Sequence, residues 1–294
     1  MAYECDVSEI ITTFLLNTCR LFSRSTELDV QAANCCAAMG SKYPSDDEEA
    51  AFIPLITGSV AEFYIEPMLP LVGDIDVMFH FSTHLALPEG LPPPIQLPAE
   101  FHNYVRAYEI IDSDFPGYVY LELSYLLTQC SHDDKYNYTE YDENPPLSNG
   151  YHESKIAVPH GPALCMSYTT HSSLSVDAVR CIRCLVWPPQ AADWPTRHRN
   201  YGWPDSATLD RVVSNGCDVV GVPHRQCRHV KGMGEFQYRL SFSRAEIVLI
   251  NSWMPVQQIA YHTLRYFVKT ERLTVCADNS GAGTLSNYHI KTLM

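Results

Sequence analysis

Two short stretches decide the fold, Phe52-Ile53-Pro54-Leu55-Ile56-Thr57-Gly58-Ser59 and Gly73-Asp74-Ile75-Asp76-Val77-Met78-Phe79. Each has an apolar run typical of a strand. Side chains alternate between the two faces of a strand, so Asp74 and Asp76 point the same way while the apolar residues pack the other side. Two carboxylates on one face predict a divalent-metal site. The Gly58-Ser59 ending predicts a turn whose backbone N–H groups and hydroxyl suit a phosphate.

A third acid is expected from a later strand. Two metal ions roughly 3.5–4 Å apart need more oxygen ligands than one pair of aspartates supplies. The best candidate is Asp177, in the apolar run Leu174-Ser175-Val176-Asp177-Ala178-Val179. An Asp-x-Asp alone is more often a solvated turn or strand edge. The Gly-Ser turn before it and the lone strand aspartate after it favour the metal site.

Composition narrows the class of protein. The 294 residues are 46% hydrophobic, enough for one large bilobal domain or two smaller ones. No window approaches about eighteen consecutive apolar residues, and the N-terminus lacks the features of a signal peptide, so we expect a cytoplasmic protein that does not enter a membrane. Eleven cysteines, an odd number in a long chain, favour reduced core thiols.

The net charge of −14 argues against a protein that grips nucleic acid with its whole surface. Any such contact needs a local basic patch. The candidates for that patch are Arg20, Arg24, Arg225, Arg228, His229 and Lys231. Arg20 and Arg24 fall in a long amphipathic pattern over residues 7–40, where a solvated helix face is the alternative interpretation.

The rest of the chain predicts a mixture of strands and helices. Residues 118–123 alternate as a half-buried strand, and helical patterns follow Asp205 and cover residues 245–250 and 256–268. Residues 85–98 are rich in proline and predict a surface loop, and residues 131–151 predict a polar insertion without a core.

Two motifs leave alternatives open. Cys181-Ile182-Arg183-Cys184 has zinc-ligand spacing, but further ligands are loosely spaced, so two core thiols are favoured. Residues 236–243 alternate and place Gln237, Arg239, Ser241 and Ser243 on one face. This polar row either contacts a nucleotide or is an exposed sheet face.

Seven motifs in order resemble the family that unites cyclic GMP-AMP synthase, the cGAS-like receptors of animals and the male-abnormal twenty-one proteins. They are Gly58-Ser59, Asp74-Ile75-Asp76-Val77-Met78-Phe79, Ser175-Val176-Asp177, Trp187-Pro188, Trp203-Pro204, Arg239-Leu240-Ser241-Phe242-Ser243-Arg244-Ala245-Glu246 and Ser286-Asn287-Tyr288-His289-Ile290-Lys291-Thr292. Each motif is weak alone, but the series is specific and runs from about residue 7 to the end.

The resemblance implies an α+β, bilobal nucleotidyltransferase fold with a long N-terminal spine helix, a mixed central sheet and a helical C-terminal lobe. It places the core and spine helix in residues 1–190 and the helical lobe in residues 191–294. Family members usually continue with further helices beyond the position of Met294, which leaves the completeness of this lobe open.

The resemblance also assigns site residues. Asp74, Asp76 and Asp177 take the places of the ligands of two Mg²⁺ or Mn²⁺ ions, and Gly58 and Ser59 those of the donor-triphosphate site. The remaining nucleotide-binding positions are Arg239, Ser241, Ser243, Arg265, Asn287 and Tyr288. Of these, Arg239 and the two serines are expected at the acceptor nucleotide, Tyr288 against a base, and Arg265 against phosphates.

The implied function is synthesis of a cyclic dinucleotide second messenger of innate immunity from two nucleoside triphosphates, such as ATP and GTP. The cysteine-rich zinc ribbon of the synthase is not expected, because residues 247–262 contain no cysteine. This departure, together with the acidic charge balance, disfavours DNA and favours double-stranded RNA or another ligand, still unidentified, as the activator. His224 stands where the synthase has a lysine, which leaves the base preference open. The alternative is a catalytically silent binding or developmental protein, and the oligomeric state stays open.

Overall fold

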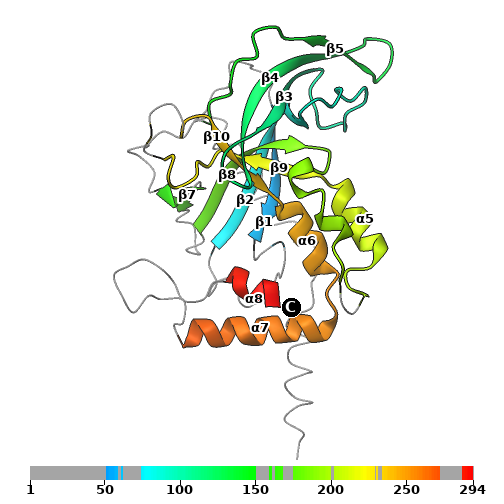
Figure 1. The fold of residues 1–294 in the computed structure, drawn as a ribbon. Helices are drawn as coiled ribbons and strands as arrows, with labels where there is room; N and C mark the ends of the chain where they lie inside the picture. The colour runs from blue at the N-terminus through cyan, green and yellow to red at the C-terminus, as the bar shows by residue number, and fades with distance from the viewer. Residues whose placement is uncertain are drawn as a thin grey trace, which may run out of the picture.

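The computed structural model describes residues 51–58, 61, 74–149, 159–160, 163–167, 175–199, 202–228, 230, 234–271 and 287–293 (Figure 1). The expected spine helix over residues 7–40 lies outside them, as do Arg20, Arg24, Ser59, His229 and Lys231. The backbones of Asp74, Asn287 and Tyr288 are described, and their side chains are not.

The described strands are β1 (Phe52–Thr57), β2 (Asp74–Pro88), β3 (Tyr104–Asp112), β4 (Tyr118–Gln129), β5 (Tyr136–Glu140), β6 (Pro159–His160), β7 (Ala163–Ser167), β8 (Ser175–Cys184), β9 (Cys217–Val220) and β10 (Gln237–Ser241). The helical segments are η2 (Pro189–Ala191), η3 (Trp194–Thr196), α5 (Ser206–Ser214), α6 (Ser243–Asn251), α7 (Pro255–Thr270) and α8 (Asn287–Leu293). The strands predicted at residues 74–79 and 118–123 are confirmed within β2 and β4.

The strands form one mixed sheet, as the sequence predicted, and six of them close into a ring. β2 pairs with β3 on one side and with β8 on the other, both in parallel. β4 joins β3 to β10, and β9 joins β10 to β8, all antiparallel. A core cluster with residues from all six strands fills the interior, including Ala86, Tyr108, Leu121, Ile182 and Val219. The ring therefore has a packed centre.

β2 is the central strand, and its length corrects one prediction. Residues 77–88 are all buried, as expected for a strand paired on both sides. The loop predicted for residues 85–98 is therefore wrong for residues 85–88, which pair with β3 and in part with β8. The prolines concentrate from Pro88 onward, where the strand ends, so the proline signal applies only to the second part of that segment.

The polar segment over residues 131–151 has more structure than the sequence predicted. Residues 136–140 form β5, which pairs with the outer part of β4. Tyr136 is buried in a cluster with Leu85, Leu127 and Phe101. The prediction of an insertion without a core is therefore wrong for this strand, because one buried tyrosine anchors a run of exposed polar residues.

The predicted helices in the second part of the chain are confirmed. Asp205 caps α5, where its carboxylate accepts a hydrogen bond from Thr208 N at 2.7 Å. α6, α7 and α8 share a second core made of Ile250, Trp253, Tyr261, Val268 and Ile290. The range expected for a helical lobe, 191–294, also contributes β9 and β10 to the central sheet.

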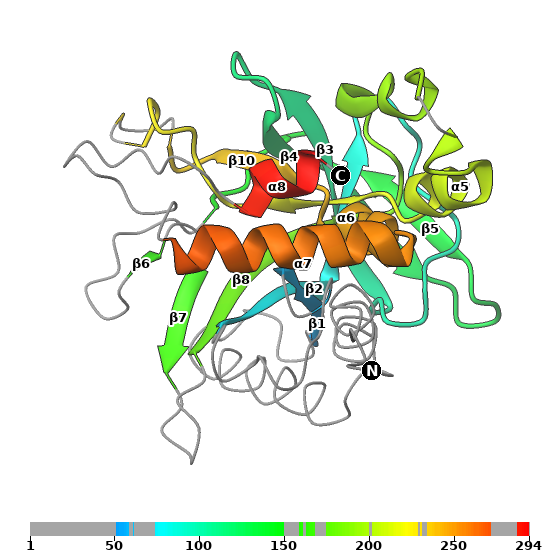
Figure 2. The same cartoon turned by 90° about the horizontal axis from the view of Figure 1, so that it is seen from below.

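Figure 2 shows α7 lying across the end of the sheet with α8 beside it. In Figure 1, the beginnings of β2 and β8 and the end of β1 lie at the sheet edge nearest α8. No helix within the described ranges is both long and apolar enough to cross a membrane.

Candidate active site

Two of the three predicted acids lie on neighbouring strands. β2 and β8 begin together, in a register that pairs Asp74 with Ser175 and Asp76 with Asp177. Side chains that are paired in this way project from the same face of a sheet, while the next residues, Val77 and Ala178, are buried on the opposite face. The structure therefore brings Asp76 and Asp177, about a hundred residues apart in sequence, to the same face of the sheet, close to where β2 and β8 begin.

The end of β1 closes over Asp76. Thr57 pairs with Asp76, and its hydroxyl donates to the Asp76 carbonyl oxygen at 3.4 Å. Gly58 follows with φ of +63°, a conformation that favours glycine. A Cβ at position 58 would overlap the Asp76 carboxylate. The turn predicted for phosphate contact thus lies directly against one of the candidate metal ligands.

The donor set fits a hard divalent cation. Carboxylate oxygens are the ligands preferred by Mg²⁺ and Mn²⁺, and two carboxylates side by side repel each other unless a cation or proton lies between them. Among the side chains that the structure describes, no group of three or more His, Cys, Asp or Glu is placed to hold a metal. Asp74 is outside that set, because only its backbone is described.

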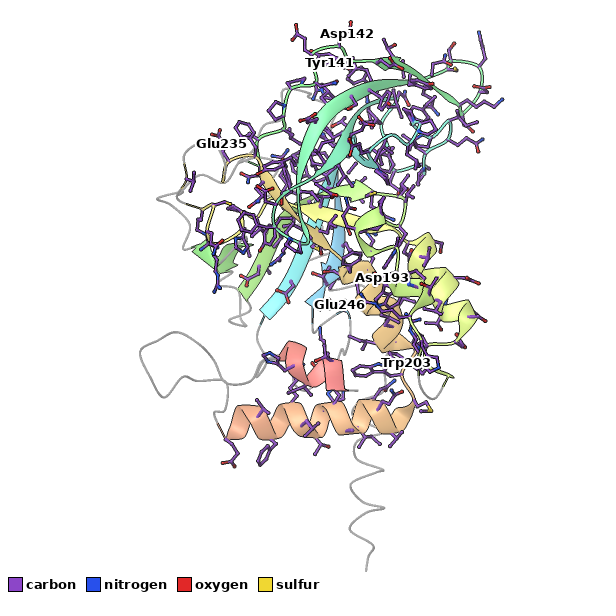
Figure 3. All side chains as sticks on the ribbon, in the orientation of Figure 1. Tyr141, Asp142, Asp193, Trp203, Glu235 and Glu246 are labelled. Carbon is purple, nitrogen blue, oxygen red and sulfur yellow. The ribbon has the colours of Figure 1, made fainter. Side chains whose placement is uncertain are left out.

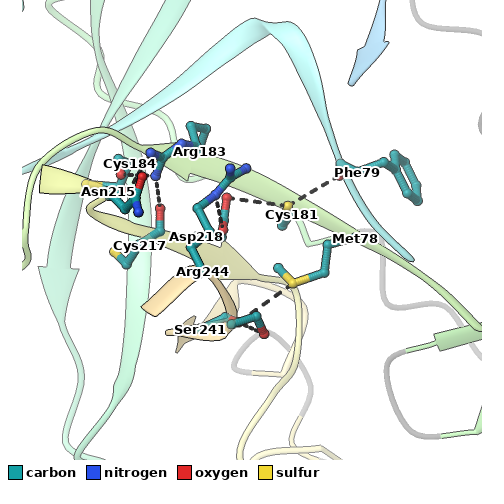
Figure 4. A network of polar contacts seen from close by, with 11 residues as sticks. Met78, Phe79, Cys181, Arg183, Cys184, Asn215, Cys217, Asp218, Ser241 and Arg244 are labelled. Carbon is teal, nitrogen blue, oxygen red and sulfur yellow. Dashed lines mark hydrogen bonds and ion pairs between the residues drawn. The ribbon is translucent and has the colours of Figure 1, made fainter. Parts of the chain in front are cut away.

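The predicted acceptor serines reach the same face of β2. Ser241 ends β10, and its Oγ lies 3.8 Å from Sδ of Met78, two residues beyond Asp76 on β2 (Figure 4). Its other neighbour is Ser243 Oγ, at 3.2 Å. The two hydroxyls form a polar pair that packs toward the strand carrying the acid. The structure thus gathers Asp76, Asp177, Ser241 and Ser243 around β2.

The polar row predicted over residues 237–243 holds along β10 up to Ser241, but its first residue is not exposed and its last lies beyond the strand. Gln237 is fully buried, and its Oε1 accepts a hydrogen bond from His224 N at 2.6 Å. Ser243 begins α6 instead of continuing the strand. Arg239 is exposed, as a residue that contacts an acceptor nucleotide requires. The segment after β9 covers this end of β10 through the His224 contact, so Gln237 is buried although alternation places it on the same face as Arg239.

Among the C-terminal helices, α6 packs against β1 and β9. Lys291 Nζ on α8 is 3.3 Å from Glu246 Oε2 on α6, which joins two of the three helices that carry predicted nucleotide-binding positions. Arg265 is half-buried on α7. The pKa of its neighbour His262 falls to about 4, mainly through burial and further through the Arg265 charge.

The predicted ligand patch is described only in part. Arg225 and Arg228 are exposed in the turn after β9. His224 stacks on Phe115 with ring centroids 4.1 Å apart and meets the edge of Tyr118. An aromatic stack therefore holds the His224 ring in place.

A buried ion pair beneath the serines was missed by the sequence reasoning. Asp218 on β9 is fully buried, pairs in register with Ser241, and accepts a hydrogen bond from Arg244 Nε at 2.8 Å (Figure 4). Arg244 directly follows Ser243 in the first turn of α6. The pair therefore fixes the helix start to the sheet. Its signal was present in the sequence, as a lone acid in the otherwise apolar strand Cys217-Asp218-Val219-Val220.

The C-x-x-C motif is explained by packing, and the prediction of core thiols is confirmed. Cys181 and Cys184 are buried on β8 with free thiols. Burial, and after it the nearby Asp218 charge, raises the pKa of Cys181 well above its usual value. Between them Arg183 donates to the carbonyl oxygens of Cys184, Cys217 and Asn215. This segment holds β8 and β9 together.

The mixed central sheet fits the nucleotidyltransferase fold, because Asp76 and Asp177 pair where β2 and β8 begin and the turn at Gly58 lies against Asp76. Comparison with protein families agrees with that class: residues 125–252 match the family model described as Mab-21 protein nucleotidyltransferase domain. The match agrees with the resemblance that the motifs indicated, over fewer than half of the residues of the chain. It includes Asp177, Arg239, Ser241 and Ser243, whereas Gly58, Asp74 and Asp76 precede it.

Proposed function

We propose that this protein is a divalent-metal-dependent nucleotidyltransferase that joins two nucleoside triphosphates into a cyclic dinucleotide, as cGAS-like receptors do. The observation that carries the proposal is the pairing of Asp76 with Asp177 below the Gly58 turn. The family match over residues 125–252 supports the nucleotidyltransferase class. ATP, GTP or other nucleoside triphosphates are the substrates that this class implies.

The acids and the turn have distinct roles in the proposed reaction. Asp74, Asp76 and Asp177 would hold two Mg²⁺ or Mn²⁺ ions, which when bound lower the pKa of the attacking ribose hydroxyl and neutralise the leaving pyrophosphate. Asp177 accepts the hydroxyl proton. Gly58 and Ser59 hold the donor triphosphate through backbone N–H groups and a hydroxyl.

The acceptor nucleotide is oriented by residues of β10, α6, α7 and α8. Ser241 and Ser243 present two hydroxyls 3.2 Å apart on the side of β2 that carries Asp76. Arg239 contacts the acceptor, Tyr288 stacks on a base, and Arg265 contacts phosphates. Catalysis by such a site is mostly positioning and electrostatics.

Double-stranded RNA is the activating ligand in this proposal, and the setting is cytoplasmic innate immunity. Arg225 and Arg228, both exposed, supply the described part of the basic patch. Contacts between arginines and phosphates release counterions, so retention on RNA should weaken as salt increases. Binding that does not respond to salt would remove this patch from the proposal.

The test is incubation with labelled ATP, GTP, CTP and UTP plus Mg²⁺ or Mn²⁺, with and without double-stranded RNA. Cyclic product is expected, and Asp177→Asn should reduce it at least about 100-fold, because the metal ligand and the proton acceptor are both lost. Asp210→Asn, on the exposed face of α5, is the matched control and should retain activity. Equal amounts of product from both variants would reject Asp177 as metal ligand and proton acceptor.

A second candidate is a nucleotide- or RNA-binding protein without turnover. The observation that favours it is the extent of the family match, which contains one of the three acids and excludes Asp74 and Asp76. If no condition gives product while a fluorescent nucleotide still binds and is displaced by ATP, the binding protein is the correct description.

A further inference from the structure

A pocket of about 350 Å³ lies among η2, η3, α6 and α8. All four tryptophans of the chain line it: Trp187, Trp194, Trp203 and Trp253. Its volume falls in the usual range for small-molecule pockets, about 300–1,000 Å³. Of the predicted metal-binding and nucleotide-binding residues whose side chains the structure describes, none lines it. It is therefore separate from the described part of the candidate active site.

The aromatic wall of the pocket is fixed by packing and hydrogen bonds. Trp187 contacts Trp194 and Phe242, with ring centroids 5.5 and 5.1 Å away. Its Nε1 donates to Ala191 O at 2.8 Å, and Trp203 Nε1 donates to Ser252 Oγ at 3.2 Å. The indole N–H groups of Trp187 and Trp203 are therefore already hydrogen-bonded within the protein. The wall is thus rigid and apolar, which reduces the entropy cost of binding.

The polar part of the wall consists mainly of hydrogen-bond acceptors. Glu246 pairs with Lys291 through Oε2, and no described residue donates a hydrogen bond to its Oε1. Figure 3 shows Glu246 on α6 and Trp203 near the far end of that helix. Thr292 donates its hydroxyl proton to His289 O, so its oxygen is left as an acceptor. Because Lys291 balances the Glu246 charge, the wall favours a neutral donor over a cation.

We propose that this pocket binds a flat, neutral aromatic molecule that donates a hydrogen bond to Glu246. A flat ring gains offset or edge contacts with the indoles that an aliphatic molecule cannot make. A ring N–H satisfies the carboxylate oxygen. A cation would gain from the indole faces but would be repelled by Lys291. The proposal does not depend on the nucleotidyltransferase function.

The test uses benzimidazole, a flat aromatic with one N–H donor, and tryptophan fluorescence as the readout. Because every tryptophan lines the pocket, a saturable change in emission reports on this site. We expect saturation without metal or nucleotide, unaffected by added ATP. 1-Methylbenzimidazole lacks the donor and should bind up to about tenfold more weakly. No saturation, equal binding of the two compounds, tighter binding of tetramethylammonium, or displacement by ATP would each overturn the proposal.

Matched variants localise the binding. Ala191→Phe puts a ring into the pocket and should weaken benzimidazole at least about tenfold. Ala192, the next residue, is exposed and does not line the pocket. Ala192→Phe should therefore bind benzimidazole as tightly as the natural chain does. Glu246→Ala is the second variant, in case Ala191→Phe fails to fold, and it should remove the preference for the N–H compound. Unchanged binding in whichever variant folds contradicts the proposal.

Discussion

The two halves of the candidate site are held in place by different forces. The strand half, β1, β2 and β8, is positioned by backbone pairing that runs from Asp74 to Ala86 on β2. The helix half, α6 to α8, is joined to the sheet and to itself mainly through side chains, including the pairs Arg244–Asp218 and Lys291–Glu246. The relative position of Asp76 and Asp177 should therefore tolerate most side-chain changes, whereas the acceptor residues depend on a few contacts.

The largest effect is expected at Asp218, where the two halves join. Asp218→Asn leaves Arg244 beside a buried site without its counter-charge, and loss of one partner of a buried pair costs about 3–5 kcal/mol. Urea unfolding measures this loss. The control is Asp193→Asn, because the Arg197–Asp193 pair has the same 2.8 Å distance but side chains 61% and 68% exposed. That variant should lose under about 1 kcal/mol, and equal losses would show that burial is not what matters.

The next effect is the acid sensitivity of the strand half. The pKa of His84 on β2 is lowered to about 3, first by burial and then by the charges of Arg180 and Arg106. The folded protein keeps His84 neutral while the unfolded chain protonates near its usual value, so the unfolded state binds more protons between these two pKa values. The contribution of His84 to stability is therefore constant above about pH 6.5 and falls by roughly 3 kcal/mol by pH 4.

His84→Phe tests this contribution, because the ring can keep the stacking on Tyr108 without a titrating group. Urea unfolding at pH 7 and pH 4.5 should show a smaller difference in the variant than in the natural chain. His80 on β2, whose pKa is also lowered by burial, and His262 on α7 remain in both proteins and contribute to the residual slope. The same slope in both proteins would assign the acid sensitivity to groups other than His84.

A smaller effect on stability, with a larger one on metal binding, is expected at Gly58. Gly58→Ala should destabilise by about 1–2 kcal/mol because of its positive φ, and it should also displace the Asp76 carboxylate. Gly90→Ala is the matched control, since Gly90 has φ of +71° and no heavy atom within 4 Å of an added Cβ. Mn²⁺ titration should separate them: weaker affinity in both variants would indicate a general backbone effect.

The smallest effect is expected where the helix half meets itself. Lys291→Met should cost about 0.2–1 kcal/mol, because Glu246 is partly exposed and solvent screens the pair. A double-mutant cycle with Glu246→Gln measures the coupling, and added salt should reduce it. A coupling energy as large as the loss of stability in Asp218→Asn would mean that the Lys291–Glu246 pair holds α8 as firmly as the Arg244–Asp218 pair holds α6.

The sequence predicted most of what depends on local pattern. Alternation placed Asp74 and Asp76 on one face, and the lone acid in residues 174–179 identified Asp177 as the next candidate. Apolar periodicity located the helices of the second half, the first of them directly after Asp205. The sequence predicted a turn at Gly58. The structure adds a steric reason for glycine at this position, its close approach to Asp76, which the sequence does not show.

The features that the sequence did not predict depend on contacts between distant segments. β2 continues to Pro88 because β3 and β8 cover it, and β5 exists because Tyr136 reaches the cluster around Leu127. The Asp218–Arg244 pair joins residues on β9 and α6 whose partnership no spacing rule encodes. Closure of the strands into a ring also requires all of its strand pairings to form together, and local sequence patterns do not specify which strands pair.

β2 pairs with three strands, β1, β3 and β8, so insertions and deletions within it should be poorly tolerated. Removing one residue between Asp76 and Phe81 would rotate one end of the strand by a face and break the ladders on both sides together. Insertions should instead be tolerated at the polar tip between β4 and β5, residues 130–135, far from the acids. Permissive sites for tags or domain fusions can be chosen by that rule.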